Sequence, residues 1–485
     1  MTTSTAHRAA RGGLVTLAGQ AIKMVLLLLN LVVLGRLLTP EDFGLVAMVT
    51  AVVGMAELVR DFGITTASIQ SPTLSMIQKN NLFWINSALG LGLAVVAALL
   101  SHPLVLFYGD SRLVPITLAI SSVFLINGIQ AQYQVELTRS LRFKALALTD
   151  ISSNAVALGA AVAAASLGAG YWSLVIMQLT SALLLLISRM FVSEWHPGMP
   201  GRNGQVRKFL RYGGNLGVAQ FLNYISANAP SVLMGYAYGA SALGSYSRAS
   251  QIATIPVNQV FGPLTNVALT TLVRITDNSA FNRAVGIMQI LLGYTASLGS
   301  SFLVVFSAPI IHLLLGDKWG SVSPLLQILA VGITFQAATF VSYWVFLAKD
   351  RTVSLLRYNL LTKSIVLSLT LVGGFFGVEE MVWGYTAGLI LAWPISVLWL
   401  RTMGVPSAIP LSGGLRFIGL GLVATMGGLL MPLTGVVELP VLASAIGWSV
   451  GLVVPLLFPQ TRMDLRVIFM TMRQLIRPKP SIKGN

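Results

Sequence analysis

The clearest candidate for chemistry is a lysine inside an apolar stretch. Lys23 lies about ten residues, or ~15 Å along a helix axis, from the start of the stretch 13–38. Placing a charge in hydrocarbon is costly, so such a residue is a default candidate for a functional site. One interpretation places its ammonium group in a water-filled cavity, where it would attract an anion. The other lets it reach the cytoplasmic interface along its apolar stem.

Three more polar residues share this stretch and are candidates for substrate binding: Gln20, Asn30 and Arg36. Arg36 lies near the opposite end of the stretch from Lys23. One helix could therefore offer two cationic stations at different depths, and an anion moving outward could pass from the first to the second.

The stretch 213–238 is unusually polar for an apolar segment. Gln220, Asn223 and Tyr224 share one helix face, and Asn228 follows them. A polar stripe of this kind can line a cavity and form hydrogen bonds with sugars. Its other interpretation is interhelical hydrogen bonding, which is common in membrane bundles.

Charged residues also end two of the apolar stretches. Glu57 and Arg60 end one of them, and Arg274 and Asp277 end another. These pairs are candidates for a cytoplasmic gate, with ordinary interfacial charge as the alternative.

Nothing in the chain indicates catalysis, so the protein is expected not to be an enzyme. The four histidines are scattered, there are no cysteines, and no zinc-protease, nucleophile-elbow or P-loop pattern is present. No metal or cofactor is therefore expected. The net charge of +16 does not indicate nucleic-acid binding, because the basic residues are spread over short segments between apolar stretches.

Composition identifies the elements that must position these residues. The chain is 55% hydrophobic and only 9% charged, whereas soluble domains carry about 25% charged residues. Apolar stretches of spanning length predict an all-α integral membrane protein with about fourteen transmembrane helices. The spans are expected near residues 13–38, 43–59, 80–101, 113–136, 145–168, 170–193, 213–238, 250–273, 284–308, 322–347, 355–376, 380–400, 415–431 and 441–458.

The basic residues orient this map. With the N-terminus in the cytoplasm, 26 of the 31 Lys and Arg residues fall on the cytoplasmic side and four on the outside. Arg36, Arg112, Arg248 and Lys318 are the external four. The positive-inside rule then places both termini in the cytoplasm.

A weak internal repeat divides the chain. A shift of 200 residues aligns Gly35 with Gly235 and Gly44 with Gly244. Six spans separate the copies, so they share one orientation and predict two lobes related by an axis along the membrane normal. The expected parts are an N-lobe (1–193), a cytoplasmic linker (194–212), a C-lobe (213–401), two further spans (402–460) and a basic cytoplasmic tail (461–485).

Four segments in order resemble a known family. They are GRLLTPEDFGLVAMVTAV with DFGITTASIQ, ELTRSLRFKALA, MGYAYGASALGSYSRASQIATIP and LLLGDKWGSVSPLLQIL. Together they resemble polysaccharide-exporting flippases of the multidrug/oligosaccharidyl-lipid/polysaccharide superfamily, and colanic-acid-type and lipopolysaccharide-type exporters look most similar. The similarity covers nearly the whole chain and is weakest after about residue 405.

The resemblance implies two six-helix lobes around a central cavity, and alternating access. It implies outward movement of an oligosaccharide on undecaprenyl pyrophosphate across the bacterial cytoplasmic membrane, with basic cavity residues such as Lys23 meeting the pyrophosphate. The implied partners are this lipid-linked oligosaccharide, membrane lipids, a polysaccharide polymerase and glycosyltransferases. Related members often carry an acidic residue in the seventh span, where this chain has Ala229 and Pro230, so ion coupling there lacks its carboxylate.

Three rival functions stay open from sequence. A cation-coupled multidrug antiporter of the same superfamily would need a carboxylate inside a lobe, and the candidates are Glu57, Glu136 and Asp150, all near span ends. A membrane enzyme of polysaccharide assembly is disfavoured because no large external loop is present. A scaffold for such assembly is the third.

Overall fold

The structure is a computed structural model of the 485-residue chain. It describes residues 3–54, 65, 68, 69, 71, 74–201, 207–434 and 439–476. Within these helices, the side chains of residues 3–18, 207–223, 226, 256, 258–263, 266, 267 and 471–476 are outside the description.

The predicted all-α fold is confirmed. The described residues contain helices and no strand, and their α-helices are α1 (Thr3–Leu37), α2 (Pro40–Val53), α5 (Met76–Leu99), α6 (Ser101–Tyr108), α7 (Leu113–Arg139), α8 (Phe143–Ser166), α9 (Trp172–Val192), α10 (Arg207–Leu272), α11 (Asn278–Leu314), α12 (Val322–Ala348), α13 (Thr352–Gly373), α14 (Val378–Arg401), α15 (Ala408–Leu430), α16 (Pro440–Val453) and α17 (Pro459–Ile476). By length and composition, 11 helices in the described part could cross a membrane. The count of fourteen spans stays a prediction.

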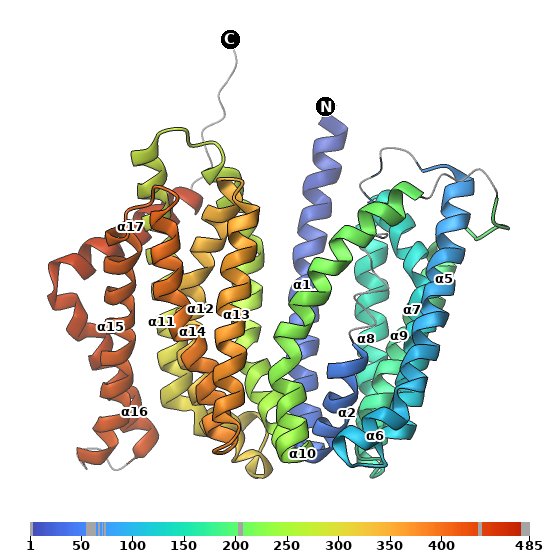
Figure 1. Ribbon diagram of the computed structural model, residues 1–485, viewed down its shortest axis with the longest axis horizontal. Helices are drawn as coiled ribbons and strands as arrows, with labels where there is room; N and C mark the ends of the chain where they lie inside the picture. The colour runs from blue at the N-terminus through green and yellow to red at the C-terminus, as the bar shows by residue number, and fades with distance from the viewer. Residues whose placement is uncertain are drawn as a thin grey trace. The chain divides into compact units, whose positions relative to one another are not determined.

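The chain divides into two compact units by its internal contacts. The first unit comprises Met1–Ser247 and Leu314–Trp319, and the second comprises Arg248–Leu313 and Gly320–Asn485. In the first unit α5 packs on α7, α8 packs on α9, and α1 lies against α8 (Figure 1). In the second unit α13 and α12 pack on α14, and α15 packs on α16. The division into lobes at residues 193 and 213 stays a prediction.

Two elements differ from the sequence expectation. The stretch after residue 460 was expected to be a tail, but the structure has helix α17 there. The Asp464 carboxylate of this helix forms a 2.8 Å ion pair with the Arg416 guanidinium. An external loop was expected between residues 238 and 250. Instead, α10 is interrupted only at Gly239 (φ 80°, ψ −173°), so Arg248 lies in the helix and is buried. Glycine tolerates this left-handed φ, so one residue suffices for the turn.

Local sequence signals explain where α2 begins. Thr39 caps the helix: its hydroxyl accepts a hydrogen bond from the Asp42 amide, and the Asp42 carboxylate accepts one of 2.9 Å from the Thr39 amide. Pro40 follows in the first turn, where its missing N–H costs nothing. This capping box fixes the start of α2 beside the end of α1.

Two glycines of the internal repeat, Gly44 and Gly244, lie at one close contact inside the first unit. Each glycine faces the backbone of the opposite copy of the repeat. A Cβ added to Gly44 would lie 1.7 Å from the carbonyl oxygen of Ala240, and one added to Gly244 would lie 1.8 Å from that of Pro40. Pro40 and Ala240 are related by the same shift of 200 residues as the two glycines. The start of α2 and the second part of α10 therefore cross with their backbones almost touching, and we call this crossing the glycine seam.

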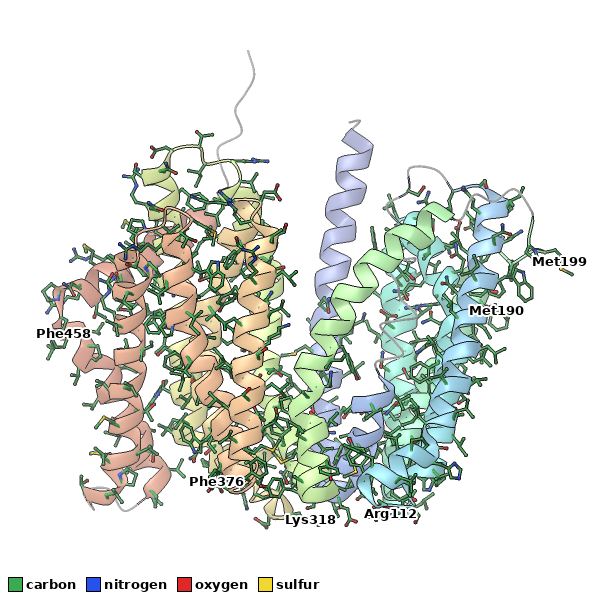
Figure 2. The ribbon with its side chains drawn as sticks, viewed as in Figure 1. Arg112, Met190, Met199, Lys318, Phe376 and Phe458 are labelled. Carbon is green, nitrogen blue, oxygen red and sulfur yellow. The ribbon has the colours of Figure 1, made fainter. Side chains whose placement is uncertain are left out.

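Residues that were assigned to opposite sides of the membrane lie toward opposite ends of the first unit. Figure 2 shows Arg112 and Lys318, both expected outside, at one end of this unit. Met190, just before the expected cytoplasmic linker, and Met199, within it, lie toward the other end. Which end faces the cytoplasm stays a prediction.

Site-directed labelling tests this orientation. The chain has no cysteine, so cysteines placed singly at the exposed positions Ser111 and Met199 are unique labels. We expect a membrane-impermeant maleimide added to intact cells to label the cysteine at 111, and to label the one at 199 only after the cells are opened. The reverse pattern would contradict the topology.

Candidate functional site

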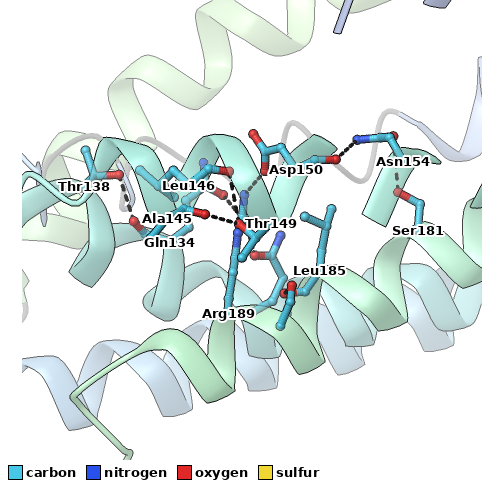
Figure 3. Close-up of polar contacts among 12 residues, drawn as sticks. Gln134, Thr138, Ala145, Leu146, Thr149, Asp150, Asn154, Ser181, Leu185 and Arg189 are labelled. Atoms are coloured by element: carbon cyan, nitrogen blue, oxygen red, sulfur yellow. Dashed lines mark hydrogen bonds and ion pairs between the residues drawn. The ribbon is translucent and has the colours of Figure 1, made fainter. Parts of the chain in front are cut away.

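Lys23 is part of a charged cluster between helices of the first unit. Its ammonium group forms an ion pair with one carboxylate oxygen of Asp150, on α8. The other carboxylate oxygen lies 2.6 Å from the guanidinium of Arg189, on α9. Figure 3 shows Asp150 and Arg189 pointing toward each other across these two helices. One carboxylate therefore faces two cations.

Two glutamines of α7 complete the cluster through contacts with the arginine. The guanidinium of Arg189 donates to the side-chain oxygen of Gln130 and, at 3.1 Å, to that of Gln134. The arginine side chain is 5% exposed, the Asp150 side chain 20%, and the Lys23 side chain 39%. The cluster thus carries one excess positive charge, and its accessible cation is Lys23.

The position of the cluster follows from helix geometry. Asp150 lies seven residues after the start of α8, and Arg189 lies three residues before the end of α9. These offsets correspond to about 10 Å and ~5 Å along the helix axes. Lys23 is held by a residue of another helix, and its place in a cavity or at the interface stays a prediction.

The other candidates of the first span lie at other positions along α1. Asn30 is partly buried, and its amide lies 3.0 Å from the sulfur of Met177 on α9. Gln20 and Arg36 are exposed. Their roles in substrate binding stay predictions.

Two residues of the polar stripe line a pocket within the first unit. Tyr224 and Asn228, on α10, face a pocket of about 360 Å³ together with residues of α2, α7 and α9. The tyrosine hydroxyl donates a 2.8 Å hydrogen bond to the carbonyl of Thr50, and this bond ties α10 to α2. The side chains of Gln220 and Asn223 lie outside the described residues.

The candidate gate residues are only partly described. Glu57 and Arg60 lie outside the described residues. Arg274 and Asp277 are exposed between α10 and α11. The Asp277 carboxylate accepts hydrogen bonds from the Ser279 hydroxyl and the Ala280 amide, which hold its pKa below the ordinary value. This is the arrangement of a helix N-cap for α11, and a gating role stays a prediction.

A second carboxylate inside the first unit is also paired. Glu136, on α7, lies 2.7 Å from the ammonium group of Lys79, on α5. Among the described residues no group of three or more His, Cys, Asp or Glu could hold a metal ion. Asp150 and Glu136 therefore both face cations within the first unit.

Arg189 is a site residue that was not expected from the sequence. It was assigned to the cytoplasmic side by its place near the end of an apolar stretch, yet it is buried within α9. Three apolar residues follow it before the helix ends, Met190, Phe191 and Val192. That apolar turn was the available signal that the arginine points back into the bundle.

Arg139 illustrates a basic residue with a structural role. Its guanidinium donates to the carbonyls of Ser68 (2.7 Å) and Ser71 (2.6 Å), and so joins that segment to the end of α7. Leaving these carbonyls unpaired costs about 1–3 kcal/mol each where they are buried. We expect Arg139→Ala to lower the melting temperature of the purified protein without changing which lipid-linked sugar is bound, as measured by thermal unfolding and by competition binding. An altered sugar preference at normal abundance would contradict this.

The helical bundle and its apolar helices define a polytopic α-helical membrane protein. The model of the polysaccharide biosynthesis protein family matches residues 33–324, and the chain belongs to that family. A curated relative, the lipopolysaccharide biosynthesis protein WzxC of Escherichia coli K12, is 25% identical over 72% of this chain and 71% of its own length. The teichuronic acid biosynthesis protein TuaB of Bacillus subtilis 168 is 29% identical over 57% of this chain and 58% of its own length.

Solved structures share the fold. The inward closed lipid II flippase MurJ matches 96% of this chain and all of its own, with a TM-score of 0.66 and 14% identity. An inward-facing multidrug resistance MATE family transporter of the MOP superfamily matches 79% of this chain and 94% of its own, with a TM-score of 0.56 and 14% identity. Flippases and drug transporters thus share this architecture, and only the site can distinguish them.

Proposed function

We propose that the protein moves an oligosaccharide linked to undecaprenyl pyrophosphate from the cytoplasmic to the external leaflet of the bacterial cytoplasmic membrane by alternating access. The family and the relatives, which are named for lipopolysaccharide and teichuronic acid biosynthesis, support this class of substrate. The partners are this lipid, the surrounding membrane lipids, the glycosyltransferases that build the oligosaccharide and the polymerase that uses it. The protein itself performs no covalent chemistry, and both termini lie in the cytoplasm.

The cationic cluster carries the proposal. A diphosphate that enters a protein interior loses its hydration and needs a positive partner. Arg189 already neutralises Asp150 at 2.6 Å, so the charge of Lys23 is in excess. The lysine is also the most exposed of the three charged residues of the cluster. Lys23 is therefore the group that meets the diphosphate.

Asp150 makes this contact reversible. In the structure its carboxylate is paired with the Lys23 ammonium group. A phosphate oxygen of the diphosphate would take the place of this carboxylate beside the ammonium group. When the diphosphate arrives, Lys23 exchanges one anion for another, and when the diphosphate leaves, the carboxylate takes the lysine back. The exchange keeps the lysine from being left as an unpaired charge at any stage, and it lowers the barrier to release.

The same contacts disfavour a cation-coupled antiporter. Such a transporter needs a carboxylate that can bind a proton or a cation inside the bundle. Asp150 faces two cations and Glu136 faces Lys79, so both of these described candidates are already neutralised. A cationic drug would also be repelled by the excess charge of the cluster.

Reconstitution tests the proposal directly. Purified protein in liposomes is given a fluorescent undecaprenyl-diphosphate-linked oligosaccharide, and a membrane-impermeant quencher reports which leaflet holds it. We expect the lipid to change leaflets faster than in protein-free liposomes, with its mass unchanged. A change in mass would indicate an enzyme, and no change in leaflet or mass would indicate a scaffold. Uptake of ethidium driven by a proton or sodium gradient would indicate the antiporter.

A further inference from the structure

We infer that the pocket lined by Tyr224 and Asn228 is a subsite for an uncharged sugar, several units along the oligosaccharide from the diphosphate. This inference rests on the proposed function and adds to it a second recognition point with its own chemistry. The pocket lies wholly within the first unit, between α2, α7, α9 and α10.

The lining has the composition of a sugar site. Amide and hydroxyl groups reach it from Thr50, Gln178, Tyr224, Asn228, Ser231 and Ser247. The phenyl ring of Phe124 and small aliphatic side chains form the remaining wall. Its volume of about 360 Å³ is at the small end of the ~300–1,000 Å³ typical of ligand pockets. Neutral donors and acceptors beside an apolar wall suit the hydroxyl groups and the C–H face of a sugar ring.

The pocket selects against charged sugars. None of the twelve described residues that line it carries a formal charge. A uronic acid placed there would lose hydration of its carboxylate without gaining a counter-ion, which is costly in a low-dielectric interior. An uncharged hexose or N-acetylhexosamine would lose only hydroxyl and amide hydration, and the lining amides replace those hydrogen bonds.

One wall of the pocket is held in place by backbone packing. The hydroxyl of Tyr224 is fixed on the carbonyl of Thr50 at 2.8 Å. Gly54 leaves room for this ring, since a Cβ added there would lie 2.4 Å from the tyrosine hydroxyl. The Asn228 amide donates at 3.0 Å to the carbonyl of Tyr224 one turn earlier, and its side-chain oxygen remains an acceptor for a sugar hydroxyl.

Helix α9 sets the distance between the pocket and the cationic cluster. It carries Gln178 of the pocket and Arg189 of the cluster, eleven residues apart, which is about 16 Å along the axis. Between them, the Ser181 hydroxyl donates to the side-chain oxygen of Asn154 at 3.5 Å (Figure 3). One sugar attached to a diphosphate at Lys23 cannot reach the pocket, whereas a short oligosaccharide can.

Binding of soluble substrate fragments tests the subsite. The probes are farnesyl diphosphate, its monoglucosyl form, and its trisaccharide forms built from glucose, galactose or N-acetylglucosamine. A further trisaccharide ends in glucuronate. For at least one neutral trisaccharide we expect binding at least tenfold tighter than that of farnesyl diphosphate, with no gain for the monoglucosyl or glucuronate-ended probes. Dissociation constants are measured by titration calorimetry on the full-length protein in detergent.

Variants assign the gain to the pocket. Gln178→Ala and Asn228→Ala should each weaken the trisaccharide about fivefold, the effect of one hydrogen bond of about 1 kcal/mol, and leave farnesyl diphosphate unchanged. Gln178→Glu keeps the side-chain size and should weaken the glucuronate-ended probe further. Ser122→Ala is the matched control on α7, because that hydroxyl donates to its own helix carbonyl and does not line the pocket.

The outcomes separate this inference from the proposed function. Equal binding of all sugar-bearing probes, or a full trisaccharide gain in both alanine variants, would overturn the subsite. Failure of farnesyl diphosphate to bind, with a trisaccharide gain that the variants remove, would overturn the diphosphate contact and leave the subsite standing. Failure of every probe would overturn both.

Discussion

Replacing Lys23 with alanine is expected to lower the rate of lipid-linked oligosaccharide transport by at least tenfold while leaving the amount of protein in the membrane unchanged. A charge-assisted contact is worth about 1.5–3 kcal/mol, or roughly ten- to a hundredfold in binding. The fold should tolerate the change, because Asp150 keeps its 2.6 Å contact with Arg189. Lys23→Arg should retain part of the activity, since the charge persists while its geometry becomes more rigid.

The measurement is leaflet exchange in liposomes, with membrane abundance determined on the same samples. Lys144→Ala is the matched control, because Lys144 is an exposed lysine in the first turn of α8, six residues before Asp150. Near-normal transport by the Lys23→Ala variant would show that the lysine serves only the fold or the interface. Equal loss of transport by Lys144→Ala would show that transport depends on the total positive charge and not on the position of Lys23.

Substitution at the glycine seam is expected to have the second large effect. Alanine at Gly44 would place a methyl carbon 1.7 Å from the carbonyl oxygen of Ala240, and because backbone cannot rotate away, the two helices must separate. Overpacking of this kind costs typically about 1–3 kcal/mol. We expect Gly44→Ala and Gly244→Ala to lower the melting temperature, and Gly44→Val to prevent stable accumulation of the protein.

A glycine in open space provides the control for this prediction. Gly92, on α5, has no atom within 4 Å of an added Cβ, and alanine there should leave stability equal or slightly higher, because alanine favours helix. Melting in detergent, followed by fluorescence-detected size exclusion, measures both effects. Equal melting temperatures for Gly44→Ala and Gly92→Ala would refute the close approach at the seam.

The fold was predictable because its signals are local. Runs of apolar residues with few charges identify membrane helices directly, since lipid leaves the backbone no partner outside its own helix. The turn at Gly239 was harder to predict from the sequence, because one glycine with positive φ replaces the expected external loop. Helix α17 was also missed, since a basic segment after the last apolar stretch was assigned to the tail by its charge alone.

The candidate site was predictable only in part because its contacts are tertiary. Depth within an apolar stretch identified Lys23, but no local pattern pairs it with Asp150, 127 positions along the chain. Asp150 and Arg189 were both placed near span ends, where charge is ordinary. Only the packing of α1 on α8 and of α8 on α9 brings the three side chains together. Likewise, Tyr224 and Asn228 were recognised by helical spacing, whereas Gln178 was not, because it is a single amide in an apolar helix.

The glycine seam also has a consequence for how this sequence can change over time. Gly44 faces Ala240 while Gly244 faces Pro40, so each half of the repeat supplies both the small residue and the carbonyl that requires it. This is the self-complementary pattern of a symmetric homodimer interface, here closed within one polypeptide. In a homodimer one mutation would alter both contacts at once. In the single chain a mutation alters only one of the two contacts. Each glycine is nevertheless constrained by the carbonyl that the opposite half of the repeat places against it.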